Sequence, residues 1–115
     1  MTLMQIAFVV LCAAAAGGAT LTLCVALRMR YPAFLGSGHG IAGLTGLVLL
    51  YAAHLFGGAP VGVWWGLILI TFALLGGLVL LRTLFRQKIP LWLALGHGVL
   101  GASGLYLIYP LAFGN

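Results

Sequence analysis

The chain alternates between long apolar runs and short breaks that carry proline, glycine or basic residues. Four runs are long enough to cross the hydrocarbon core of a bilayer as helices, which takes about 20 residues each. These runs cover residues 4–28, 33–56, 61–83 and 90–112. We expect Pro32, Pro60 and Pro90 to begin the second, third and fourth helices, because proline suits the first helical turn. The pattern predicts an all-α fold, a transmembrane four-helix bundle.

The composition supports a membrane protein. Of 115 residues, 64% are hydrophobic, five are Lys or Arg and none is Asp or Glu, so no polar shell for a soluble domain can form. The N-terminal run has no charged segment before it and is too long for a signal peptide, so we expect it to stay in the fold. The lack of carboxylates excludes paired-carboxylate catalysis, carboxylate sites for calcium or magnesium, and the acidic residues of proton-coupled pumps.

The basic residues lie at the ends of the predicted spans, where membrane topology explains them, so no nucleic-acid partner is expected. They are Arg28, Arg30, Arg82, Arg86 and Lys88. The positive-inside rule then places the 29–32 and 84–90 connections in the cytoplasm and both termini and the 57–60 turn outside, in a bacterial inner membrane. Trp64 and Trp65 fit an interfacial aromatic belt on that outer side.

Two stretches repeat one pattern without a gap. Residues 32–51 read PAFLGSGHGIAGLTGLVLLY, and residues 90–109 read PLWLALGHGVLGASGLYLIY. A glycine pair precedes each stretch in the preceding helix, at 17–18 and at 76–77. The chain therefore reads as one domain, residues 1–115, built from two tandem helix hairpins at about 4–56 and about 61–112. Both hairpins enter the membrane in the same orientation, which puts the pseudo-symmetry axis along the membrane normal.

Each repeat places one histidine inside its apolar run. His39 lies seven residues after Pro32, and His97 lies seven residues after Pro90. Both are therefore about 10 Å into the membrane from the cytoplasmic side, and the repeat turns them toward a common axis. An ionisable side chain inside a membrane is a candidate functional group. Neutral imidazole ligates iron, and two on facing helices can take both axial positions of a haem.

Glycines follow each histidine on the same helix face. Gly43 and Gly46 come four and seven residues after His39, within about 40° of its direction, and Gly101 and Gly104 repeat this spacing in the fourth helix. Glycine removes side-chain volume, so a second helix or a flat ligand can approach the backbone. These glycines are candidates to line a porphyrin, and helix packing alone is the competing interpretation.

The arrangement resembles the membrane-embedded b-type cytochromes, in which four-helix bundles hold haem b between histidines on facing helices, with glycines lining the porphyrin. The resemblance rests on Gly38-His39-Gly40, on Gly96-His97-Gly98 and on the glycines after them. It implies one haem b with His39 and His97 as axial iron ligands, one-electron transfer between quinol and a redox partner, and basic residues near the propionates. Two-haem members carry four histidine ligands, whereas this chain has three histidines.

The third histidine, His54, has no histidine counterpart in the second repeat. It lies 15 residues after His39, about 22 Å further along the same helix. Three interpretations stay open. It is an interfacial histidine, a hydrogen-bonding group for a quinone with Tyr51 or Tyr109 nearby, or a ligand of a second haem completed by Met4 or by a neighbouring subunit.

The remaining polar residues do not form a catalytic constellation. Ser37 and Ser103 have no base and acid around them, and Cys12 and Cys24 lie roughly 18 Å apart on one helix, too far to pair. We expect an electron-transfer protein or the haem-bearing membrane subunit of an oxidoreductase, alone or in a homo- or hetero-oligomer. The alternative is a small membrane transporter, channel or structural subunit whose histidine–glycine repeat serves packing, metal binding or proton handling.

Overall fold

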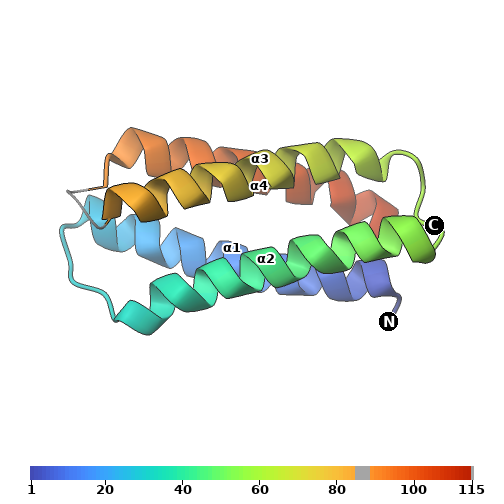
Figure 1. Cartoon of the computed structure of the whole chain (residues 1–115), viewed down its shortest axis with the longest axis horizontal. Helices are drawn as coiled ribbons and strands as arrows, with labels where there is room; N and C mark the ends of the chain where they lie inside the picture. The colour runs from blue at the N-terminus through green and yellow to red at the C-terminus, as the bar shows by residue number, and fades with distance from the viewer. Residues whose placement is uncertain (85–88, 115) are drawn as a thin grey trace.

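The computed structural model of the chain describes residues 1–84 and 89–114, without the side chains of 82–84. Four helices form an up-and-down bundle that is 43 Å long and 21 by 20 Å across (Figure 1). They are α1 Leu3–Ala26, α2 Ala33–Phe56, α3 Val63–Leu84 and α4 Leu91–Phe113. All four are long and apolar enough to cross a membrane. The predicted all-α four-helix bundle is confirmed.

The helices pack as two hairpins. Contacts are most extensive between α1 and α2 and between α3 and α4, fewer between α1 and α4, and fewest between α2 and α3. Because α1 and α3 run one way and α2 and α4 the other, both termini and the 57–62 turn lie at one end of the bundle (Figure 1). We call this the terminal end. The opposite end, where α1 leads into α2 and where α4 begins, is the connection end.

The prolines set the helix starts, with one exception. Pro32 and Pro90 are the N-cap residues of α2 and α4 and have extended ψ angles of 145° and 126°, so each helix begins one residue later. The prediction that Pro60 begins the third helix is wrong. The N–H of Val63 bonds the Pro60 carbonyl in a separate turn, and α3 begins only at Val63. Gly58, at φ 66°, takes the left-handed conformation that reverses the chain there.

The two ends of α1 are defined locally. At its start the Thr2 hydroxyl accepts from the Gln5 N–H at 3.2 Å, and the Gln5 side chain accepts from the Thr2 N–H at 2.9 Å, which completes a capping box. The Gln5 amide also donates to the Ala112 carbonyl of α4 at 3.1 Å. At the other end α1 stops at Ala26 rather than at residue 28, because Arg28 has a φ of 53° that no α-helix can include.

The packed core lies in the terminal half of the bundle. It consists of Met4, Ala7, Leu11, Leu47, Leu50, Ala53, Val63, Leu67, Ile70 and Ile108. The other half of the bundle, from the level of the histidines to the connection end, has little buried surface. It comprises residues 15–45 and 74–103, and among the described residues there only Ala94 is buried. The start of α2 diverges from α3 at this end (Figure 1). The apolar side chains around the histidines are therefore only partly covered by the protein.

The internal repeat extends to the contacts inside each hairpin. Matched positions differ by 59 residues in the first helices and by 58 in the second. A Cβ atom on Gly46 would lie 2.6 Å from Cγ of Leu11, and one on Gly104 would lie 2.5 Å from Cγ1 of Ile70. Each hairpin thus closes by packing a branched apolar side chain of its first helix onto a glycine of its second.

Candidate cofactor-binding site

Helices α2 and α4 occupy opposite corners of the bundle. In the described parts of the chain the backbone of each lies close to α1 and α3 but not to the backbone of the other. Each presents one partly buried histidine toward the bundle axis. The rings of His39 and His97 meet edge to face, with centroids 5.8 Å apart and planes at 90°. The structure therefore brings together the two histidines that the repeat pairs.

Both imidazoles are held by the same kind of hydrogen bond. Nδ1 of His39 lies 2.7 Å from the carbonyl oxygen of Ala14, and Nδ1 of His97 lies 2.6 Å from that of Ala73. A carbonyl oxygen only accepts, so in each ring Nδ1 carries the proton and donates. In the neutral ring Nε2 then keeps a free lone pair. Histidines that ligate metals are typically oriented in this way, with the other N–H bonded to a backbone carbonyl.

Glycine makes these two carbonyls accessible. A carbonyl inside an α-helix already accepts from the N–H four residues later, which for Ala14 is Gly18 and for Ala73 is Gly77. Its second lone pair is reachable only where no side chain covers it. The glycine at each of these positions leaves that approach open, so the same glycine–histidine contact occurs in both hairpins.

The imidazole rings lie directly on the glycines. A Cβ on Gly18 would be 2.7 Å from Cε1 of His39, and a Cβ on Gly77 would be 3.1 Å from Cε1 of His97. Either side chain would push its ring away. The sequence identified the glycine pairs as part of the repeat but did not reveal that Gly18 and Gly77 make room for the imidazole rings. The available signal was their matched spacing, 20 to 22 residues before the histidine of each repeat.

The four glycines predicted to line a ligand separate into two levels. Gly46 and Gly104 receive the branched side chains described above and belong to helix packing. Gly43 has no other residue within 4 Å of its Cβ position, and the Cβ position of Gly101 is 4.0 Å from the Cβ of Ala73. Of these four glycines, Gly43 adjoins open space and Gly101 meets only the methyl group of Ala73, so these two leave more room for a flat ligand than Gly46 and Gly104 do.

His54 lies apart from this site. Its ring packs against Trp64 with centroids 4.6 Å apart and planes at 66°, and its Nδ1 is buried without a hydrogen-bond partner in the described structure. Trp64, expected only as an interfacial anchor, is thus also a packing partner of α2. The hydroxyl of Tyr51 bonds that of Thr71 at 3.0 Å and links α2 to α3.

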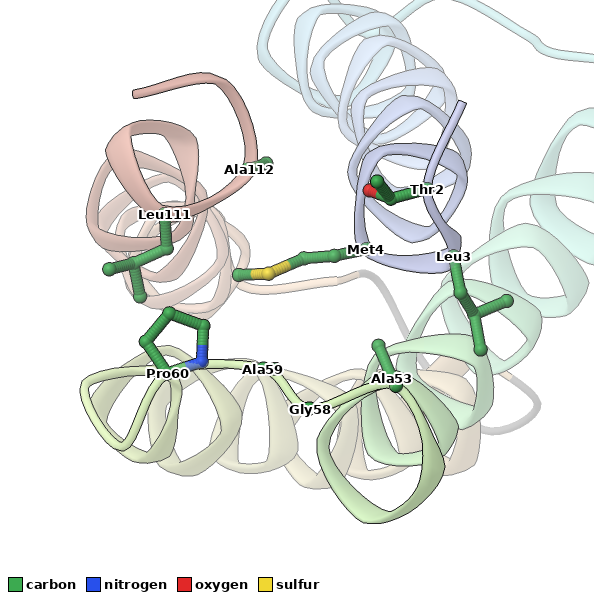
Figure 2. A pocket seen from close by; sticks show the side chains of 10 residues that line it. Thr2, Leu3, Met4, Ala53, Gly58, Ala59, Pro60, Leu111 and Ala112 are labelled. Carbon is green, nitrogen blue, oxygen red and sulfur yellow. The ribbon is translucent and has the colours of Figure 1, made fainter. Parts of the chain in front are cut away.

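Met4 lines a cavity of about 210 Å³ at the terminal end. Its side chain extends from α1 across this cavity toward α4, and Leu111, Ala53 and Pro60 stand around it (Figure 2). His54 does not line the cavity. Within residues 1–84 and 89–114, no group of three or more His, Cys, Asp or Glu side chains is placed to hold a metal ion. The histidine pair is therefore the strongest candidate for ligation in the described structure.

The structure describes the side chains of two of the five basic residues. Arg28 and Arg30 lie exposed in the connection between α1 and α2, at the end of the bundle nearer the histidines. The side chains of Arg82, Arg86 and Lys88 lie outside the described part of the structure. The two cysteines, Cys12 and Cys24, are free, which agrees with the prediction that they do not pair.

Comparisons with known proteins do not assign the chain to a family: no family model, no curated protein and no solved structure matches it. Its function is therefore inferred from the geometry around His39 and His97.

Proposed function

We propose that the chain is a membrane b-type cytochrome that binds one haem b between His39 and His97 and transfers single electrons between quinol and a redox partner. The observation that carries this proposal is the pair of Nδ1–H bonds to backbone carbonyls. They orient both rings and leave each neutral imidazole one lone-pair nitrogen, which is the donor set that bis-histidine haem ligation requires.

The spacing of the rings supports the same assignment. Bonds between a metal and an imidazole nitrogen are about 2 Å long, so two imidazoles on opposite faces of one iron have centroids roughly 6 Å apart. The observed separation is 5.8 Å. In the observed edge-to-face contact one ring turns its face toward the other, so that ring would have to turn until its Nε2 points at the metal. Ligation would need no large displacement of α2 or α4.

The surroundings suit a large apolar plate. A porphyrin held by His39 and His97 would lie between α2 and α4, and the glycines beside the two histidines, Gly40 and Gly98, have no other residue within 4 Å of their Cβ positions. Gly43 also adjoins open space, and Gly101 has only the Ala73 methyl group at 4.0 Å. The apolar side chains from here to the connection end are poorly buried by the protein itself, and a plate placed here would cover them.

The haem would supply one-electron chemistry, and with both axial positions filled it would leave no coordination site for oxygen or substrate. The chain holds and orients the group. His39 and His97 bind the iron, and the two carbonyls fix the ring orientations. Arg28 and Arg30 offer positive charge to propionates at the connection end. One haem near one face does not by itself carry electrons across a bilayer.

We also propose that the bundle spans a bacterial inner membrane with two hairpins in the same orientation. The four helices have the length and apolarity for this. The connection end would face the cytoplasm, because all five basic residues lie in the two connections there or, for Arg82, in the last turn of α3, and the terminal end would face outward.

The test is a reduced-minus-oxidised absorption spectrum of the detergent-purified protein, with haem quantified per chain. We expect a low-spin b-type spectrum at one haem per chain, altered or lost in His39→Ala and His97→Ala and kept in His54→Ala. Two haems per chain would instead make His54 a ligand. A colourless protein from haem-replete cells would overturn the proposal and favour the transporter, channel or packing interpretation.

A further inference from the structure

A groove of about 290 Å³ is lined by α1 and α2, beside His39. Its wall includes small residues, an exposed aromatic ring and the histidine itself, namely Ala13, Gly17, Phe34, Gly38, His39 and Ala42. Apart from the imidazole it presents no ionisable side chain. All of its lining residues belong to α1 and α2, and none belongs to α3 or α4.

The internal repeat is broken at this groove. By the offsets of 59 and 58 residues, Ala13 corresponds to Phe72 on α3, and Ala42 corresponds to Leu100 on α4. The glycines and the histidine of the wall have identical counterparts in the second hairpin. Two alanines therefore keep space open in the first hairpin at positions where the second hairpin carries larger side chains. The groove is therefore expected beside His39 and not beside His97.

We propose that this groove binds the ring of a lipid-soluble quinone or quinol. The choice of ligand rests on the proposed function, since a haem held by His39 needs a redox partner. Sites for small molecules are mostly apolar with few polar groups and occupy about 300–1,000 Å³. At about 290 Å³ the groove is just below this range, and it suits one substituted ring rather than a porphyrin.

Two features of the wall favour a flat ring. Phe34 offers an aromatic face for offset stacking, and the glycines let the ring approach the backbones of α1 and α2 closely. His39 is part of the wall and also the proposed iron ligand. A ring in the groove is therefore separated from the iron by one imidazole. Because α3 and α4 do not line the groove, it would be open to the acyl chains of a bilayer, in which quinones dissolve.

The experiment measures equilibrium binding of decyl-benzoquinone to the full chain in phosphatidylcholine nanodiscs, with empty nanodiscs as background. Wild type is expected to bind one quinone per chain. The Ala13→Phe/Ala42→Leu variant copies the second hairpin and should bind about tenfold more weakly. The reverse variant, Phe72→Ala/Leu100→Ala, should open a second groove beside His97 and raise the stoichiometry toward two. Single Ala42→Leu serves if the double variant does not elute as a folded species.

Haem content, measured on the same samples, separates this inference from the proposed function. Red wild-type protein that binds no quinone above background overturns the groove assignment, as does equal affinity in wild type and Ala13→Phe/Ala42→Leu. The first result would leave the groove to lipid acyl chains, and the second would place the quinone elsewhere on the chain. Colourless protein whose quinone binding responds to both variants as expected would keep the groove and refute the cytochrome.

Discussion

Gly18 of α1 lies against the imidazole of His39 on α2, so closely that a Cβ atom there would be 2.7 Å from Cε1 of the ring. The equivalent distance between Gly77 and His97 is 3.1 Å. The two glycine–histidine contacts have the same arrangement, but the one at Gly18 is closer. Substitution of these glycines therefore tests the role of each histidine without changing the histidine.

Gly18→Ala should lower haem affinity more than Gly77→Ala does, because its methyl group overlaps the ring more deeply. We expect a loss of about 1–3 kcal/mol for Gly18→Ala, the usual cost of overpacking. Haem titration of the apoprotein measures this. Gly17→Ala is the matched control, because its Cβ would make an ordinary contact of 3.7 Å with His39. Equal haem affinities in Gly18→Ala and Gly17→Ala would contradict the inference that Gly18 makes room for the His39 ring.

Gly46→Ala should destabilise the bundle without changing the haem spectrum, because its methyl group would collide with Leu11 in the packed core. The expected cost is about 1–3 kcal/mol in the free energy of unfolding, measured by SDS titration in mixed micelles. Gly40→Ala, with no other residue within 4 Å, should be close to neutral. If the contact is direct, Gly46→Ala combined with Leu11→Ala will cost less than the sum of the two changes.

Tyr51→Phe should remove the hydrogen bond that links α2 to α3, the least extensive helix interface. Hydrogen bonds between membrane helices contribute about 0.6 kcal/mol on average and up to about 1.7 kcal/mol. A double-mutant cycle with Thr71→Val isolates the pair. Tyr109→Phe is the control, since its ring packs on Phe8 and its side chain is exposed. No coupling between Tyr51 and Thr71 would refute the link.

His54→Phe should leave stability unchanged or raise it, because phenylalanine keeps an aromatic ring against Trp64 and removes the unpaired Nδ1. His54→Ala loses the ring contact and should cost about 0.5–1.5 kcal/mol or more. Thermal unfolding in detergent distinguishes the two. A larger loss in His54→Phe than in His54→Ala would show that the nitrogen has a partner and reopen the ligand interpretation.

The proposed topology predicts the activity of reporter fusions. Alkaline phosphatase fused after Gly114 should be active, because both termini would lie outside, and an insertion in the 27–32 connection should be inactive. A green fluorescent protein at the same two sites should give the opposite pattern. The reverse result at both sites would invert the bundle and place the histidines nearer the outer face.

The helix boundaries could be predicted closely, because the apolar runs are separated by proline, glycine and basic residues, which favour breaks between helices. Pro32 and Pro90 fix two starts to within one residue. Pro60 misled because the turn around Gly58 continues past it, and turn length depends on backbone conformations that composition does not specify. The end of α1 was missed for the same reason, since the left-handed conformation of Arg28 has no sequence mark.

The meeting of the two histidines could be predicted from the repeat, whereas their supports could not. The hydrogen-bond acceptors are main-chain atoms of Ala14 and Ala73, and any residue type supplies a carbonyl. The division of the glycines also needed the structure. Gly43 and Gly46 share one face, and only the height of Leu11 on the neighbouring helix decides which of them is covered.

The bond from the Gln5 amide to the Ala112 carbonyl brings the beginning and the end of the chain together, at the same end of the bundle as the 57–62 turn. A circular permutant opened at Gly58 and joined through a short linker would therefore encode the same four helices in the order α3, α4, α1, α2. The two halves should also complement each other as separate fragments. Neither half alone should bind the proposed haem as the pair would, because each half contributes only one of the two facing imidazoles, His39 or His97.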